Sequence, residues 1–223
     1  MKKIIFKESQ FDKLIINEMH LNGFDWKTLS QYIKMGYLVH GSNEDFEKFD
    51  TSRINGGVRA EYGYGMYFTN EPYKALEYGQ EIYLTKMNLY KFFDLESNDI
   101  SAFDEIEKTR NELSKAKYEL YNAVNVRDYE YYDDLVKKLT FKTRIGDYED
   151  VVYNEFSKRL KKGGYKNLED VFKSVRMNLP THFDKYISSF FIKIGYDGIK
   201  CGNQFVIFNF ELLNNNLLKE IVE

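Results

Sequence analysis

The pattern of apolar residues changes about a hundred residues into the chain, and this change limits the folds that the chain can adopt. From Ser101 to about Gly164 the sequence is highly charged, and its apolar residues recur at helical spacing with breaks near Asn125 and at 145–147. Short apolar segments typical of strands lie on both sides. Strands that gather around a helical middle predict an α+β domain with a helical insertion at about residues 101–180.

The expected elements other than the helices of the charged stretch are short. Strands are predicted at Lys3–Phe6, Tyr37–His40, Gly65–Thr69, Glu81–Leu89 with a continuation over Phe92–Leu95, and Gln204–Phe210. Helices are predicted at Gln10–Met19, at Trp26–Ile33 behind an Asp25 cap, at Pro72–Tyr78, at Leu168–Val175 and at Thr181–Ile194. A polar tail follows. We interpret the 223 residues as one domain, with a helical N-terminal extension over about residues 1–36.

The composition argues against several classes of protein. No run approaches the ~18 apolar residues of a membrane span, and the first residues lack the apolar stretch of a signal peptide. One cysteine, Cys201, allows neither an internal disulfide nor a cysteine-based zinc site, and no histidine spacing indicates a metal. A net charge of −3 provides no overall attraction to nucleic acid. We expect a cytoplasmic protein without a metal or a membrane partner.

His40 ends an apolar segment and is followed directly by Gly41 and Ser42. A lone histidine in this place is either a buried core residue or a functional one. The glycine favours function, because it lets a ligand reach the backbone N–H and C=O groups. A planar carboxamide requires that pair of one donor and one acceptor.

The stretch EYGYGMYFTNEPYKALEYG, residues 61–79, contains five tyrosines and two closely spaced glycines. No third glycine and no Lys-Ser/Thr pair follows, so we reject a phosphate-binding loop. Tyr67 on a strand and Tyr78 on the helix that begins at Pro72 could hold a flat cationic ring between them. The alternative is that both rings belong to the core.

Taken together, LVHGS, GYGMYFTNEPYKALEYG, GYDGI and NQFVIF resemble the ADP-ribosyltransferases of the diphtheria-toxin and poly(ADP-ribose) polymerase class. The resemblance covers about residues 37–95 and 192–212. It implies a split β-sheet core, NAD as the substrate, and a His-Tyr-Glu triad on three strands. The catalytic residues that it implies are His40, Tyr67 and Gln204, and the NAD-binding residues are His40, Gly41, Ser42, Tyr67, Ala75 and Tyr78.

In this resemblance His40 binds the adenosine ribose, Gly41 holds the nicotinamide carboxamide, and the two tyrosines enclose the nicotinamide. Ala75 stands where polymerase-type members often have a serine, which removes one hydrogen bond to the carboxamide. Gln204 stands at the position of the triad glutamate; Glu211 fits the pattern less well because it lies beyond the strand. A glutamine keeps the hydrogen bond to the ribose but lacks the negative charge that stabilises a cationic transition state.

Three explanations for Gln204 stay open: a natural variant that transfers slowly or singly, an inactive relative that still binds NAD, and an engineered inactive form. We expect a mono-ADP-ribosyltransferase with a macromolecular acceptor, protein rather than nucleic acid. By analogy it is a phage or bacterial effector, toxin or counter-defence protein, with an inhibitor or antitoxin as a second partner. The alternatives are a catalytically dead NAD-binding or interaction module and an NAD glycohydrolase.

Basic residues are frequent in the later helical stretch. They are Lys158, Arg159, Lys161, Lys162, Lys166, Lys173 and Arg176. We interpret them as a solvated helix face, with contact to the acceptor as the alternative.

Overall fold

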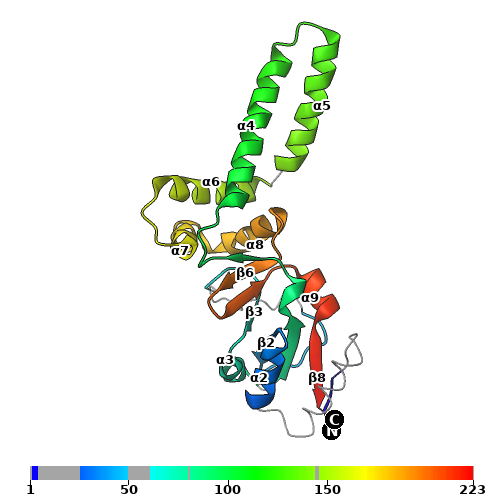
Figure 1. Cartoon of the computed structure of the whole chain (residues 1–223), viewed down its shortest axis with the longest axis vertical. Coiled ribbons are helices and arrows are strands. Elements are labelled where there is room, and N and C mark those ends of the chain that lie inside the picture. Colours follow the sequence, from blue (N-terminus) through cyan, green and yellow to red (C-terminus); the bar gives the residue numbers. More distant parts are fainter. Residues whose placement is uncertain (1, 5–25, 50–60, 80, 144–145, 223) are drawn as a thin grey trace.

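The computed structural model describes residues 2–4, 26–49, 61–79, 81–143 and 146–222, arranged as a sheet with helices around it (Figure 1). The strands are β1 Lys2–Ile4, β2 Tyr37–Ser42, β3 Met66–Thr69, β4 Glu81–Lys86, β5 Phe92–Asp94, β6 Gly198–Cys201, β7 Gln204–Ile207 and β8 Leu218–Val222. The α-helices are α2 Trp26–Lys34, α3 Pro72–Tyr78, α4 Ser101–Tyr121, α5 Val126–Thr143, α6 Asp147–Lys162, α7 Leu168–Asn178, α8 Asp184–Lys193 and α9 Phe210–Asn216, with 3-10 turns at Met87–Leu89 and Thr181–Phe183.

The strands form one mixed, open sheet in the order β1-β8-β4-β2-β3-β7-β6-β5, in which β5 and β6 are parallel. β2 pairs with β4 over six residue pairs, but its pairing with β3 is confined to Val39 and Thr69. Continued antiparallel register would place Gly41 opposite Tyr67, and these two described residues are not paired. The sheet therefore opens between β2 and β3 directly beside His40.

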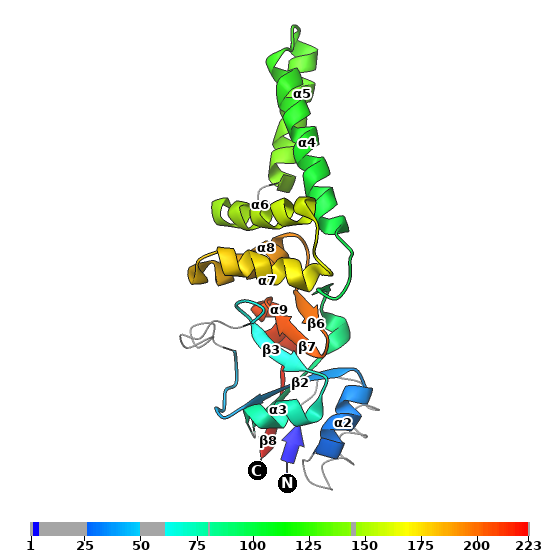
Figure 2. The same ribbon diagram turned by 90° about the vertical axis from the view of Figure 1, so that its left-hand side faces the viewer.

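Helices cover the two halves of the sheet separately. α2 and α3 pack on β2 and bury Leu29, Tyr32, Val39 and Ala75 in one apolar cluster. The helices α6, α7 and α8 bury a second, phenylalanine-rich cluster together with β5 and β6. Figure 2 shows these three helices between the sheet and the α4–α5 hairpin. A third apolar cluster, which includes Leu38 of β2, Phe68 of β3 and Phe205 of β7, spans the opening between β2 and β3.

The α4–α5 hairpin projects beyond the other helices (Figure 1). The two helices pack mainly against each other. Near the base, the buried Phe103 of α4 joins the phenylalanine-rich cluster. Among the described residues, no helix has both the length and the apolar composition that crossing a membrane requires.

The predicted α+β class and the helical middle of the chain are confirmed, as is the break near Asn125. At the second predicted break, at 145–147, Ile145 lies outside the described residues and Asp147 is the first residue of α6. The helix from Pro72 to Tyr78 has the predicted bounds. The predicted helix Gln10–Met19 and its neighbour's Asp25 cap lie outside the described residues, as do Ile5 and Phe6 of the first predicted strand.

Four predictions about strands are wrong. The strand predicted over Glu81–Leu89 ends at Lys86, and Met87–Leu89 forms a 3-10 turn. Phe92–Asp94 does not continue the preceding strand, because β5 pairs with β6 at the opposite side of the sheet from β4. β2 extends through Gly41 and Ser42, because both residues pair with β4. The last predicted strand ends at Ile207, and the expected polar tail instead forms α9 and β8. In this tail Leu213 is fully buried and Leu218 pairs with Leu84. The three asparagines between the leucines interrupt the apolar pattern, so the sequence did not predict these elements.

Candidate active site

A cavity of about 450 Å³ lies at the opening between β2 and β3. Small-molecule sites have volumes of roughly 300–1,000 Å³, so the space suits part of a nucleotide-sized ligand. The described residues that line it are Val39, His40, Gly41, Glu61, Tyr67, Phe68, Thr69, Lys74, Ala75, Tyr78 and Gln204. Six of the seven residues predicted to form a site therefore lie around one space, and Ser42 is the exception.

His40 is held as a neutral hydrogen-bond acceptor. Its Nδ1 lies 2.6 Å from the Tyr67 carbonyl oxygen, which only accepts, so Nδ1 carries the proton. Nε2 is then an acceptor. Four aromatic rings surround the imidazole, with centroids 5.6 to 6.4 Å away: Phe46, Phe49, Phe68 and Tyr83. Burial lowers the pKa of His40 below 6.5, and the hydrogen bond to Tyr67 offsets only part of this effect.

Gly41 is required by packing as well as by the shape of the cavity. A Cβ atom at this position would lie 1.8 Å from the Ala75 carbonyl oxygen of α3. A Cβ at Gly79 would lie 2.0 Å from the Ser42 carbonyl carbon. These two glycines therefore let α3 approach the end of β2, and this approach places Ala75 and Tyr78 beside His40.

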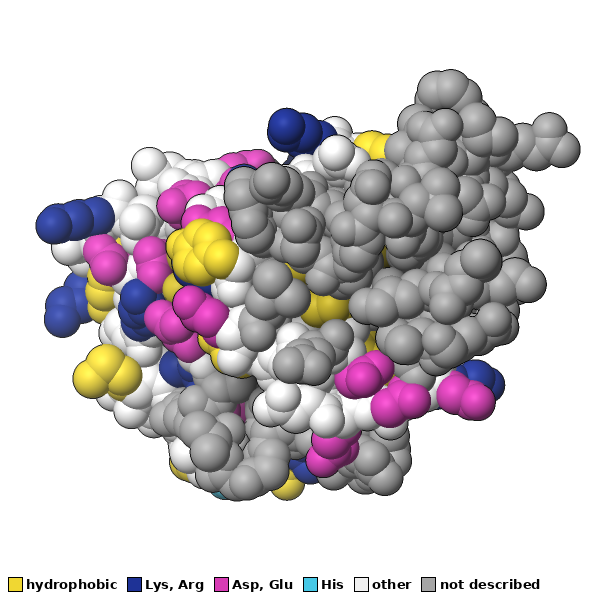
Figure 3. All heavy atoms as spheres, turned by 90° about the horizontal axis from the view of Figure 1, so that it is seen from below, with side chains coloured by type: hydrophobic (Ala, Val, Ile, Leu, Met, Phe, Trp, Pro, Cys, Tyr) yellow, Lys and Arg dark blue, Asp and Glu magenta, His cyan; other side chains and the backbone are white. Residues whose placement is uncertain are grey.

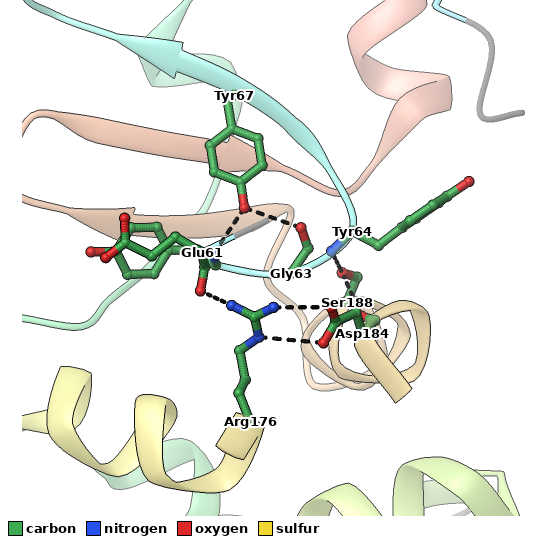
Figure 4. A network of polar contacts seen from close by, with 8 residues as sticks. Glu61, Gly63, Tyr64, Tyr67, Arg176, Asp184 and Ser188 are labelled. Atoms are coloured by element: carbon green, nitrogen blue, oxygen red, sulfur yellow. Dashed lines mark hydrogen bonds and ion pairs between the residues drawn. The ribbon is translucent and has the colours of Figure 1, made fainter. Parts of the chain in front are cut away.

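Tyr67 has its hydroxyl group fully engaged within the protein. The hydroxyl accepts a hydrogen bond from the Tyr62 backbone N–H at 2.8 Å and donates one to the Gly63 carbonyl at 3.1 Å (Figure 4). Burial raises the pKa of Tyr67, so the phenol stays protonated. The hydroxyl thus fixes the orientation of the side chain, and the ring is what remains for a ligand.

The other predicted binding residues differ in what they offer to a ligand. The Tyr78 side chain is 66% exposed, and its ring does not contact that of Tyr67 in the described structure, so the two rings leave space between them. Ala75 is buried and has no polar side-chain group. The Ser42 hydroxyl accepts a hydrogen bond from the Glu44 N–H at 3.0 Å, which stabilises the local turn instead of the cavity wall.

Gln204 begins β7 directly opposite Thr69 of β3. The residue is half-buried, and within the described part of the chain its side-chain amide forms no hydrogen bond. The amide therefore presents one acceptor and one donor group to the cavity, without charge. Cys201 pairs with Gln204 across the β6–β7 turn but is not among the residues that line the cavity.

Sequence reasoning missed five lining residues: the apolar Val39 and Phe68, and the polar Glu61, Thr69 and Lys74. The Thr69 hydroxyl accepts a hydrogen bond from the Glu71 N–H at 2.9 Å, and the Lys74 ammonium lies 2.7 Å from the Glu71 carboxylate. Glu61 opens the tyrosine-rich stretch, and its position there was the only available signal. A charged residue in a turn gives no periodicity that would indicate a cavity.

The turn before β3 is tied to α7 and α8 (Figure 4). The buried guanidinium of Arg176 donates a hydrogen bond to the Glu61 carbonyl and pairs with Asp184 at 2.9 Å. Ser188 accepts a hydrogen bond from the Tyr64 N–H at 3.1 Å. The helices α7 and α8 therefore hold the segment that orients Tyr67.

The interpretation of the basic residues as a solvated face is wrong for Arg159 and Arg176, which are both buried. Arg159 binds Ser174 and Glu155, and Lys161 pairs with Glu107 at 2.7 Å. On the face shown in Figure 3, the acidic and basic side chains of the described residues are interspersed. The contacts of Arg159, Arg176 and Lys161 reduce the basic charge that these helices expose.

Within the described ranges, no group of three or more His, Cys, Asp or Glu side chains could hold a metal ion. No protein-family model, curated protein or solved structure matches the chain.

Proposed function

We propose that the protein is a mono-ADP-ribosyltransferase that binds NAD in the cavity between β2, β3 and α3 and transfers ADP-ribose to a macromolecular acceptor. The observation that carries the proposal is the convergence of His40, Tyr67, Tyr78 and Gln204 on one cavity. These residues come from three strands and a helix, and 164 positions separate the first from the last. A core histidine and core tyrosines would not require such an arrangement around an open space.

Each side chain has a role that matches its hydrogen-bonding state. The Tyr67 and Tyr78 rings hold the cationic nicotinamide, and the Gly41 backbone holds its carboxamide. The Nε2 atom of His40 accepts a hydrogen bond from a ribose hydroxyl, and the Gln204 amide oxygen accepts another. Bond cleavage then depends on positioning and electrostatics, without a covalent nucleophile.

A protein acceptor is favoured over nucleic acid, because the chain is acidic and Arg159 and Arg176 are buried. The role of an effector or toxin, with an inhibitor as a partner, follows from the resemblance of the motifs. The neutral Gln204 amide favours one further candidate, a module that binds NAD without cleaving it. An NAD glycohydrolase, in which water replaces the acceptor, is the remaining alternative.

The test is incubation of the protein with labelled NAD and a cell lysate. We expect nicotinamide release and label in protein. Label in free ADP-ribose alone would indicate the glycohydrolase, and NAD binding without nicotinamide release would indicate the binding module. Absence of both binding and release would contradict the proposal.

The aromatic clamp is tested by calorimetric titration with NAD. Each ring contributes about 1–2 kcal/mol, so Tyr67→Ala or Tyr78→Ala should weaken affinity by about 5- to 30-fold. Tyr73→Ala is the matched control for Tyr78, since Tyr73 lies on the same helix, is 56% exposed and does not line the cavity. Unchanged affinity in both cavity variants would exclude the clamp.

A further inference from the structure

The described residues that line the cavity include two with charged side chains, Glu61 and Lys74. The Lys74 ammonium is neutralised by Glu71 at 2.7 Å. The Glu61 carboxylate lies 3.7 Å from the Lys173 ammonium, and Lys173 pairs more closely with Glu169. Two carboxylates thus share one ammonium group, and the described residues of this wall carry a net negative charge.

The backbone of Glu61 is fixed relative to Tyr67. The Glu61 carbonyl accepts a hydrogen bond from Arg176, whose side chain is only 9% exposed. The next two residues bind the Tyr67 hydroxyl through the Tyr62 N–H and the Gly63 carbonyl. Figure 4 shows this arrangement, in which one turn both carries Glu61 and orients Tyr67.

The chemistry of NAD cleavage requires a negative charge in such a place. When the bond between the ribose C1′ and the nicotinamide nitrogen breaks, its electron pair moves to that nitrogen and neutral nicotinamide leaves. The positive charge moves from the pyridinium ring to the ribose. A nucleophilic atom of the acceptor then bonds to C1′ and loses its proton to solvent. A carboxylate near the ribose stabilises the intermediate charge.

We propose that Glu61 supplies this negative charge, which the neutral Gln204 cannot. The inference rests on the proposed transferase function and concerns the same cavity. The triad glutamate that Gln204 replaces would both bind the ribose and supply negative charge. Here Gln204 accepts the hydrogen bond from the ribose, and the Glu61 carboxylate faces the developing cation.

The experiment measures nicotinamide release at saturating NAD for the wild type, Glu61→Gln, Gln204→Glu and the double variant. Glu61→Gln should lower kcat at least about tenfold, since loss of one electrostatic group in an active site costs roughly 10²- to 10³-fold at the upper end. The KM for NAD should change far less than kcat. In the Glu61→Gln background, Gln204→Glu should restore most of the lost rate, because it returns a carboxylate to the site.

Glu77→Gln is the matched control, since Glu77 is an exposed carboxylate on α3 that does not line the cavity. It should leave the rate unchanged. If Glu61→Gln releases nicotinamide as fast as the wild type, the role of Glu61 is wrong while the transferase proposal stands. If neither the wild type nor Gln204→Glu releases nicotinamide, the proposed function is wrong and the role of Glu61 falls with it.

Discussion

One backbone carbonyl decides which nitrogen of His40 carries a proton. Because the Tyr67 oxygen can only accept, the imidazole donates from Nδ1 and leaves Nε2 as an acceptor. The surrounding aromatic rings disfavour the charged imidazolium and lower the pKa of His40. The folded protein therefore keeps His40 neutral at a pH where a solvated histidine is partly protonated.

This lowered pKa predicts the pH dependence of stability. Between the folded-state pKa and 6.5, the unfolded chain binds more protons than the folded one, so the free energy of unfolding falls as pH falls. The contribution is fully present above pH 6.5 and is lost on acidification, by up to about 1.4 kcal/mol per pH unit. Urea unfolding between about pH 5 and 7.5 should show a shallower slope for His40→Gln than for the wild type.

The exposed His182 provides the control for this prediction. His182→Gln should keep the wild-type slope, because that side chain is not enclosed by the ring of aromatic residues around His40. Equal slopes for the wild type and His40→Gln would show that the burial of His40 does not contribute to the acid sensitivity.

At the scale of elements, α7 and α8 determine the geometry of a turn that is distant in sequence. Arg176 and Asp184 form a buried ion pair, with side chains 9% and 11% exposed. The same guanidinium binds the Glu61 carbonyl, and the Ser188 hydroxyl binds the Tyr64 N–H. The helices α7 and α8 are therefore part of the support of the cavity.

Removing one member of this buried pair should lower the free energy of unfolding more than removing both members does. Arg176→Met leaves the Asp184 carboxylate without its guanidinium, and we expect a loss of about 3–5 kcal/mol in the free energy of unfolding. Arg176→Met combined with Asp184→Leu should recover part of that loss, because no buried charge remains. Urea denaturation of the two variants measures the difference.

The half-exposed pair of Arg110 and Asp150 provides the comparison, with side chains 26% and 45% exposed. Arg110→Met should cost about 1 kcal/mol or less, because solvent screens this pair. The prediction fails if the double variant at positions 176 and 184 is less stable than Arg176→Met alone.

At the scale of the whole molecule, the α4–α5 hairpin lies on one side of the α6–α8 layer, and the strands β2 and β3, which border the cavity, lie on the other (Figures 1 and 2). Beyond its base the hairpin contacts little besides itself. The exposed Tyr121 and Val124 lie at its tip, whereas Phe103 at its base is buried in the core. Only the base is therefore expected to support the fold.

Shortening the hairpin tests this division. Replacing residues 113–134 with a short glycine-rich turn should leave the cooperativity of unfolding and the affinity for NAD unchanged, because Phe103 and the cavity remain. Thermal unfolding and calorimetric titration measure the two properties. Phe103→Ala in the intact chain should instead cost about 3–5 kcal/mol, because it leaves a void among packed phenylalanines. A shortened protein that unfolds without cooperativity would contradict the prediction.

The features that could be predicted from sequence depend on neighbouring residues. Pro72 begins α3 because its ring presets the backbone angle of a first helical turn, and Gly36 ends α2 with a φ of 86°. The helical repeat after Ser101 likewise acts over one or two turns. These preferences operate within a few residues, so the class of fold and the places of His40, Tyr67 and Tyr78 on their elements follow from local sequence.

Contacts between distant segments determine the structural features that the sequence did not predict. The place of β5 beside β6, the pairing of the tail as β8, and the burial of Arg176 against Asp184 depend on which surfaces pack together, and no local pattern encodes that choice. The same holds for Glu61, which borders the cavity because Arg176, 115 positions away, binds its carbonyl. The sequence by itself determined the residues that could bind a flat cationic ligand. Only the tertiary structure decided that they surround one space and that a carboxylate lies among them, because packing free energy is shared across the whole chain.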